Sequence, residues 1–213
     1  MLADFRRIKH ELNFKIECIV VDGGSSDATL EICKNFSVRV YGSQGGRGVQ
    51  LATGAEQARG DVLLFLHADS KLTARHCEVA LQIAQNNKLL AGGFHLEFVA
   101  CQRFFRFAEW LNRVRFIFTR VIYGDHGFFI TRLNYRLMGG FADMPLFEDV
   151  EFCRRLRPKG CLQLFKPPLS TSIRRFEKNG VLRTYMIMLF LHIAFRAGVS
   201  PMKLAKLYKK SVR

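Results

Sequence analysis

Short apolar runs alternate with amphipathic segments along the first hundred residues. The β-branched run at 16–21 and the fully apolar run at 62–66 predict strands buried in a sheet. Residues 37–41 predict a further strand. Capping residues followed by apolar residues at helical spacing predict helices, which are 28–36, 47–59 and 73–87. This alternation of strands and helices predicts an α/β fold, in which a mostly parallel sheet carries helices on both faces.

The second half of the chain has a less regular pattern. It predicts strands at 90–99, 127–130 and 161–166, and we expect Pro167-Pro168 to end the last of them. Helices are predicted from apolar spacing and capping residues, at 103–120, before Gly139-Gly140, at 148–156, at 181–197 and from Ser200-Pro201 onward. The helix at 181–197 is apolar almost all round, so either burial or attachment to an apolar surface is expected for it.

The charge of the chain is concentrated at one end. The 213 residues suit one domain, and 33 basic against 18 acidic residues give a net charge of +15. Residues 1–100 are neutral overall, whereas residues 154–213 carry 15 Lys or Arg and a single acid, Glu177. Such an excess points to phosphates, anionic lipid or nucleic acid as partners. The chain has no recognisable nucleic-acid motif, so we expect no nucleic acid and favour an anionic membrane surface. Burial of residues 181–197 against the sheet or in a homodimer is the alternative to membrane attachment, and the apolar pattern slightly favours burial.

Six cysteines without a C-x-x-C pair predict a reducing compartment, with neither a disulfide framework nor a zinc site. The N-terminal residues are charged and lack the apolar core of a signal peptide. The longest apolar stretch, residues 185–195, is shorter than the roughly 20 residues of a membrane-spanning helix. We therefore expect a cytoplasmic protein, and the sequence leaves open whether it attaches peripherally to the inner face of the cell membrane.

Two acidic clusters follow predicted strands, where ligands of parallel sheets bind. The first follows the strand at 16–21 and consists of Asp22, Gly23, Gly24, Ser25, Ser26 and Asp27. The second, His67 to Ser70, contains Asp69. Glycines let a ligand approach the backbone, and the helix start near Ala28 favours an anion. A carboxylate beside an anion requires a cation between them, and Mg²⁺ or Mn²⁺ held by carboxylates and substrate phosphates meets that need. Turn formation and helix capping are the alternative role for these aspartates.

A third acidic cluster begins the helix predicted at 148–156. Glu148 and Asp149 stand where the helix dipole favours carboxylates, which explains one of them without any function. The functional alternative is a general base that takes a proton from an attacking hydroxyl.

Five segments together resemble a family 2 glycosyltransferase of the GT-A fold. They are VVDGGSSDATLEI, GRGVQLATGAEQARGDVLLFLHADS, YGDHGFF, GGFADMPLFEDVEFCRRL and SIRRFEKNGVLRTY. The likeness is strongest to a small subgroup described as radical-SAM-associated or arsenosugar-biosynthesis transferases. It implies a single Rossmann-like domain over residues 1–213, with apolar and basic helices over 178–213. The family's first strand, which ends in Pro-x-x-Asn-Glu, has no counterpart here, and residues 2–12 resemble the helix that follows it.

The resemblance also implies roles for single residues. Asp22 matches the aspartate that recognises the nucleotide base, and Asp69 matches the last aspartate of the D-x-D motif, which binds the metal. His67 departs from that motif, since the family has its first aspartate there. Asp149 matches the general base, with Glu148 beside it. The remaining expected site residues serve the nucleotide, the diphosphate or the acceptor, and they are Gly23, Gly24, Ser25, Asp27, Arg47, Asp125, His126, Arg174 and Arg175.

The implied reaction is inverting transfer of a sugar from a nucleotide-diphosphate sugar to a hydroxyl of a small or lipid-like acceptor. A sugar-1-phosphate nucleotidyltransferase shares the α/β layout and is one alternative, because residues 45–48 faintly resemble the glycine-arginine loop of those enzymes. The other alternative is a catalytically impaired basic protein that binds a membrane or another anionic partner.

Overall fold

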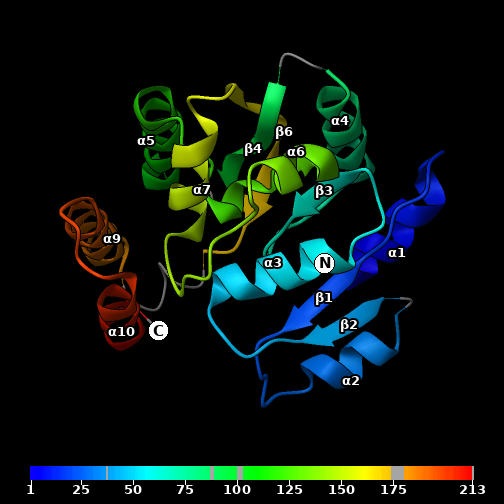
Figure 1. Ribbon diagram of the computed structural model, residues 1–213, viewed down its shortest axis with the longest axis horizontal. Helices are drawn as coiled ribbons and strands as arrows, with labels where there is room; N and C mark the ends of the chain where they lie inside the picture. The colour runs from blue at the N-terminus through cyan, green and yellow to red at the C-terminus, as the bar shows by residue number, and fades with distance from the viewer. Residues whose placement is uncertain (37, 87–88, 100–102, 174–179, 213) are drawn as a thin grey trace.

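The computed structural model describes residues 1–36, 38–86, 89–99, 103–173 and 180–212 (Figure 1). Its first half alternates helices and strands, as the hydrophobic pattern predicts. The elements are α1 (Leu2–Glu11), β1 (Ile19–Asp22), α2 (Thr29–Lys34), β2 (Arg39–Gly42), α3 (Arg47–Gln57), β3 (Val62–Phe65) and α4 (Ala74–Ala84). The predicted bounds therefore hold to within a few residues in this half.

The second half supplies the remaining strands and the long helices. Its elements are β4 (Leu89–Phe98), α5 (Arg103–Thr119), the 3₁₀ turn η1 (Gly124–His126), β5 (Phe128–Thr131), α6 (Arg132–Leu137), α7 (Glu148–Leu156), β6 (Cys161–Thr171), α9 (Val181–Arg196) and α10 (Pro201–Val212). Within the described ranges, none of the helices has the length and apolar character needed to cross a membrane.

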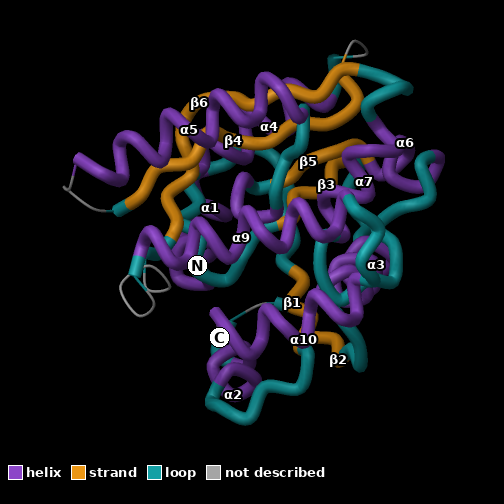
Figure 2. Tube along the Cα trace, turned by 90° about the vertical axis from the view of Figure 1, so that its left-hand side faces the viewer, coloured by secondary structure: helices purple, strands orange, loops and turns teal. Residues whose placement is uncertain are grey.

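The strands form two sheets, and the α/β class is confirmed. The first sheet is the parallel pair β1-β2, and the second has the order β3-β5-β4-β6. In the second sheet β5 runs antiparallel to both neighbours, whereas β4 and β6 are parallel. The sheet is thus mixed rather than mostly parallel. The helix α3 lies between the two sheets in both views (Figures 1 and 2).

An aromatic core packs the larger sheet against α7. Phe128 of β5 and Phe152 of α7 are fully buried with ring centroids 5.6 Å apart, and the ring of Phe141 packs against both at a tilt. Burial of such side chains contributes about 1.5–3 kcal/mol each. This core fixes α7 to the sheet, and the first turn of α7 carries Glu148 and Asp149.

The prediction that Pro167-Pro168 ends the last strand is wrong, since β6 continues to Thr171. β6 is an edge strand, and its register to β4 shifts at this point: Phe94 pairs with Phe165, but Leu96 pairs with Leu169. The two prolines lie in the irregular stretch. Proline lacks an N–H donor, and an edge strand with a bulge tolerates that lack.

Candidate active site

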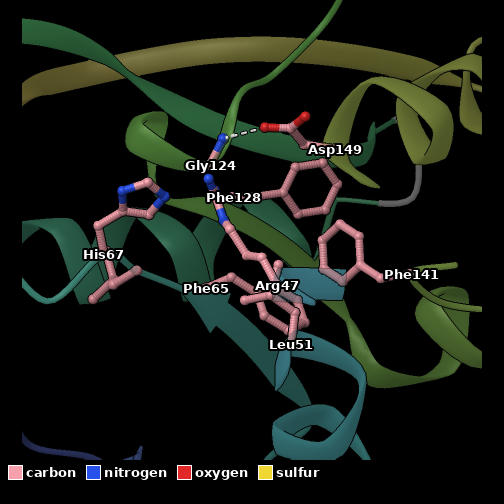
Figure 3. Close-up of a pocket in the computed structure, with 9 residues that line it drawn as sticks. Arg47, Leu51, Phe65, His67, Gly124, Phe128, Phe141 and Asp149 are labelled. Atoms are coloured by element: carbon pink, nitrogen blue, oxygen red, sulfur yellow. Dashed lines mark hydrogen bonds between the residues drawn. The ribbon is translucent and has the colours of Figure 1, made fainter. Parts of the chain in front are cut away.

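A small pocket lies at the carboxyl end of β3, where four separate segments meet (Figure 3). Arg47 comes from the first turn of α3, His67 follows β3, Gly124 begins η1, and Asp149 stands in the first turn of α7. Apolar side chains form the remainder of the lining, and these are Leu51, Phe65, Leu66, Phe128 and Phe141. Polar groups from distant parts of the chain thus converge on an apolar floor.

The carboxylate of Asp149 is buried and held by two main-chain donors. The N–H of Gly124 donates to Oδ2 at 2.8 Å, and the N–H of Val150 donates to Oδ1 at 2.7 Å. The helix begins after Phe147, whose positive φ of 67° is uncommon for a residue with a side chain. These contacts fix the orientation of the carboxylate at the pocket.

Glu148 is buried beside Asp149 and pairs with Arg47. Its Oε1 lies 2.9 Å from Nε of Arg47. Burial, together with the neighbouring Asp149, raises the pKa of Glu148 to about 7, although the guanidinium of Arg47 opposes the rise. Glu148 therefore changes its charge close to neutral pH.

Close approach of residues 142–145 to the start of α3 places Arg47 in this pair. A side chain at Gly46 or Gly48 would overlap the backbone of residues 142–145, and the N–H of Gly48 donates to the carbonyl of Met144 at 3.1 Å. Glycine at both positions lets the segment that leads into α7 lie directly on the first turn of α3. This contact explains the glycines at positions 46 and 48 of the GGRG sequence.

His67 and Gly124 complete the polar side of the pocket. Burial lowers the pKa of His67 to about 4, and the adjacent Arg47 adds to this effect, so its imidazole is neutral at pH 7. A Cβ at Gly124 would lie 1.6 Å from Nη2 of Arg47 and 2.9 Å from Nε2 of His67. The absence of a side chain at residue 124 thus creates the space in which these two groups lie.

Several buried polar atoms around the pocket have no hydrogen-bond partner among the described residues. They include Arg47 Nη2, His67 Nε2, Asp125 Oδ1 and Arg115 Nε. Buried polar groups are nearly always satisfied in folded proteins, because leaving them unpaired costs about 1–3 kcal/mol each. A polar ligand bound here would supply the missing partners.

The structure gives Asp125 and His126 different positions. His126 is fully buried: its Nδ1–H donates to the carbonyl of Phe94 at 2.8 Å, and its Nε2 accepts from Nη2 of Arg115 at 3.3 Å. Burial lowers the pKa of His126, so it is neutral. Although burial alone would raise the pKa of Asp125, His126, His67 and nearby arginines lower it, so Asp125 stays ionised. Asp125 is thus near enough to His67, Arg115 and Arg47 to interact with them electrostatically. His126 is instead buried against the backbone of β4.

The Asp22 loop lies beside α3 and does not line the pocket. Asp22 accepts hydrogen bonds from the N–H groups of Gly24 and Ser25 and from the Ser25 hydroxyl, which lower its pKa. A Cβ on Gly23 would overlap the side chain of Gln50, one helical turn after Arg47. Asp27 is exposed and accepts from Thr29 at the start of α2. The first turn of α3 thus separates this loop from the pocket.

Asp69 is exposed, and within the described ranges it forms no hydrogen bond or ion pair. The described residues contain no group of three His, Cys, Asp or Glu side chains able to hold a metal ion. An Mg²⁺ or Mn²⁺ ion bound mainly by substrate phosphates needs only one or two protein carboxylates. A free carboxylate two residues after His67 fits an ion that arrives with its substrate.

Two expected residues, Arg174 and Arg175, lie outside the described residues. Two that line the pocket, His67 and Gly124, were not among the expected site residues. A signal for both was present in the sequence: His67 occupies a motif position that normally carries an aspartate, and Gly124 directly precedes Asp125.

Comparison with known proteins gives a family and a fold. The family model described as "Glycosyl transferase family 2" matches residues 5–141. No curated protein matches the sequence.

Solved structures resemble the chain in fold. S. aureus TarS 1-349 in complex with UDP-GlcNAc has a TM-score of 0.59 at 15% identity, covering 78% of this chain and 53% of that one. The mannosyltransferase PcManGT from Pyrobaculum calidifontis, in complex with GDP-Man and Mn²⁺, has a TM-score of 0.62 at 15% identity, covering 97% and 65%. GalNAc-T7 with UDP, GalNAc and Mn²⁺ has a TM-score of 0.56 at 14% identity, covering 73% and 37%. The chain thus spans less than two thirds of the length of these proteins, and the likeness is to the fold of GT-A glycosyltransferases.

Proposed function

Because the chain belongs to glycosyl transferase family 2, we propose that it is an inverting glycosyltransferase that uses a nucleotide-diphosphate sugar. The similar structures carry UDP-GlcNAc, GDP-Man or UDP, which supports a donor of this class. The acceptor is a hydroxyl of a small or lipid-like molecule. The single observation that carries the assignment is the buried Asp149 carboxylate, oriented by Gly124 at a pocket that also contains Arg47 and His67.

In this reaction Asp149 acts as the general base. Its carboxylate accepts the proton of the acceptor hydroxyl while the hydroxyl oxygen bonds to the anomeric carbon of the donor sugar. The bond from that carbon to the diphosphate oxygen breaks, and the nucleoside diphosphate leaves. A positioned base contributes on the order of 10²–10⁴-fold to such a rate. Holding the two substrates in line supplies a further share.

Cationic and neutral donors in the pocket suit the diphosphate. The guanidinium of Arg47 has an unpartnered, buried Nη2, and Glu148 fixes its other side. Neutral His67 offers a second unpartnered nitrogen beside it. We assign both to the leaving group, whose growing negative charge such donors stabilise. We assign the Asp22 loop to the nucleotide base, on the other side of the first turn of α3.

Asp69 is the residue that would hold a divalent metal together with the donor diphosphate. When bound, the ion would act as a Lewis acid that neutralises charge on the leaving group. The presence of Mn²⁺ in the PcManGT and GalNAc-T7 structures supports this proposal.

The experiment that tests the function is a survey of UDP- and GDP-sugars with Mn²⁺ and a mixture of acceptor alcohols, with the released product identified. We expect release of the nucleoside diphosphate. Release of pyrophosphate from a nucleoside triphosphate and a sugar 1-phosphate would instead show a nucleotidyltransferase. Absence of turnover together with absence of nucleotide binding would contradict both activities.

A further inference from the structure

Three helices form one side of the molecule, which faces the viewer in Figure 2. We call this side, made by α5, α9 and α10, the three-helix face. The helix α10 packs on α9. The rings of Phe104 on α5 and Tyr185 on α9 lie 6.4 Å apart, so α5 and α9 are in contact.

The three-helix face exposes an unusual amount of apolar surface. On α9 the exposed side chains follow helical spacing and form one stripe, with exposures of 55–61%: Met186, Leu189, Phe190 and Ile193. The opposite side of α9 is packed, since Leu191 and Thr184 are buried. On α5 the exposed apolar residues range from 40% to 82%, and they are Phe104, Phe107, Trp110, Leu111, Ile117 and Phe118. Contiguous apolar patches of this kind mark interaction sites.

The charge on this face has a single sign. The same helices and the residue after α5 carry exposed cations, which are Arg113, Arg120, Arg183, Arg196, Lys203, Lys206, Lys209 and Lys210. The sequence has no acid between residues 180 and 212, and the single acid of α5, Glu109, is buried and paired with Arg106. The face therefore complements an extended anionic surface.

We propose that the three-helix face binds the surface of a lipid bilayer that carries anionic headgroups. Helices that lie in the membrane interface combine aromatic and aliphatic side chains with lysine and arginine in this way. Long basic side chains reach the headgroups while their neighbours enter the acyl boundary. Protein interfaces, by contrast, are depleted in lysine. An interfacial position also agrees with the length of α9, 16 residues, which does not span a bilayer.

The inner side of α9 connects this surface to the pocket. The hydroxyl of Tyr123 and Nε2 of His192 share a hydrogen bond of 2.5 Å, and the rings of Phe147 and Phe195 stack with centroids 4.8 Å apart. Phe147 directly precedes Glu148, and Tyr123 directly precedes Gly124. Because a helix is about 10 Å across, docking of the outer stripe holds the pocket close to the lipid. The docking itself does not depend on the proposed transferase activity.

The single tryptophan of the chain tests this proposal without any substitution. Trp110 lies on the exposed stripe of α5 and is 53% exposed. On addition of vesicles of phosphatidylglycerol and phosphatidylcholine, we expect its emission to shift to the blue and to be quenched by a lipid with a spin label near the headgroup. The proposal is overturned if the protein co-sediments with the vesicles but the emission of Trp110 does not change. It is also overturned if the protein does not co-sediment with the vesicles at low salt.

Matched variants test the apolar and basic parts separately by vesicle sedimentation. Phe190→Ser with Ile193→Ser removes half of the α9 stripe. Its control, Leu133→Ser with Leu137→Ser, removes two apolar side chains of slightly greater exposure on α6. Neutralising the four lysines of α10 to Gln is expected to weaken binding roughly 100- to 1,000-fold. Its control neutralises four exposed lysines elsewhere, Lys9, Lys34, Lys71 and Lys159.

Both test variants must bind the vesicles less than their controls do. Equal binding in either comparison, or a lipid-free dimer that Phe190→Ser with Ile193→Ser dissociates, overturns the proposal.

Discussion

The main-chain N–H of Gly124 donates a hydrogen bond of 2.8 Å to Oδ2 of Asp149 (Figure 3). This bond joins the turn before β5 to the first turn of α7, and Arg47 lies in the space left free by the missing side chain of Gly124. Gly124 thus orients the carboxylate of Asp149 and leaves room for the guanidinium of Arg47. The pocket depends on both effects.

Gly124→Ala is expected to displace Arg47 without unfolding the protein. The new Cβ would lie 1.6 Å from Nη2 of Arg47, the end of a flexible side chain that is able to move. We expect the free energy of unfolding to fall by about 1–2 kcal/mol and donor affinity to fall about tenfold. Chemical denaturation and nucleotide titration measure the two effects. Gly42→Ala is the control, because its Cβ would meet nothing within 4 Å.

The same substitution, made in an Arg47→Ala variant, shows whether Gly124→Ala acts by displacing Arg47. With the guanidinium gone, the added methyl group meets only the imidazole of His67, so the cost of Gly124→Ala should shrink by at least about 0.5 kcal/mol. Strictly additive losses in the double variant would show that residue 124 does not act through Arg47.

Arg47→Met should change both the titration of His67 and donor binding. Removal of the guanidinium is expected to raise the pKa of His67 above its value of about 4, although burial, the larger cause, keeps it below the ordinary value of 6.5. Loss of a charged hydrogen bond to phosphate should weaken donor binding about 10- to 100-fold. NMR titration of the histidine and calorimetry of nucleotide binding give the two numbers. Arg59→Met, an exposed arginine just beyond α3, is the control, and a His67 pKa equal in all three proteins would count against the contact.

Glu148→Gln should remove a dependence of stability on pH. The folded pKa of Glu148, about 7, lies above the ordinary pKa of 4.5 for a glutamate side chain. Below pH 4.5 the carboxyl is protonated in both states, and between pH 4.5 and 7 only the unfolded chain loses the proton easily. The free energy of unfolding of the natural protein should therefore fall, relative to the Gln variant, by roughly 1–3 kcal/mol as pH rises through this window.

Urea unfolding at pH 5, 6, 7 and 8 measures this difference. Glu56→Gln, an exposed change on α3, should follow the pH dependence of the natural protein. Parallel curves for the natural protein and Glu148→Gln would show that Glu148 does not titrate in this range.

Asp69→Asn should abolish the effect of a divalent metal on nucleotide binding. Because Asp69 is an exposed carboxylate two residues after His67, we expect Mn²⁺ to tighten UDP or GDP binding by at least about tenfold in the natural protein and not in the variant. Titrations with Mn²⁺ and with EDTA provide the comparison. Asp61→Asn, at the opposite end of β3, is the control. Equal metal dependence in both variants would place the metal elsewhere.

The sequence predicts local structure well where local chemistry decides it. The helix α7 begins at Glu148, as expected from carboxylates at its first turn and the apolar spacing that follows. The start of α3 at Arg47 follows from the glycines before it. The family, too, could be identified from the order of its motifs.

Contacts between distant segments could not be predicted in the same way. Two such contacts are the hydrogen bond from Gly124 to Asp149 and the ion pair of Arg47 with Glu148. They depend on how α3, η1 and α7 meet. No local pattern shows that β5 runs antiparallel between β3 and β4, or that β6 passes Pro167 with a change of register. His67 enters the pocket because of this arrangement: the sequence places it in the D-x-D motif but does not show that it lies beside Arg47 and Gly124.

The most direct test of the proposed chemistry is the turnover of Asp149→Asn, measured together with its affinity for the donor. Asparagine keeps the size of the side chain and a carbonyl oxygen that is able to accept the hydrogen bond of Gly124, but it cannot take the acceptor proton. We predict a turnover number lower by about 10²–10⁴-fold with a nearly unchanged donor dissociation constant, whereas Asp143→Asn, an exposed change in the preceding loop, keeps full activity. Full turnover in Asp149→Asn would contradict its role as the base.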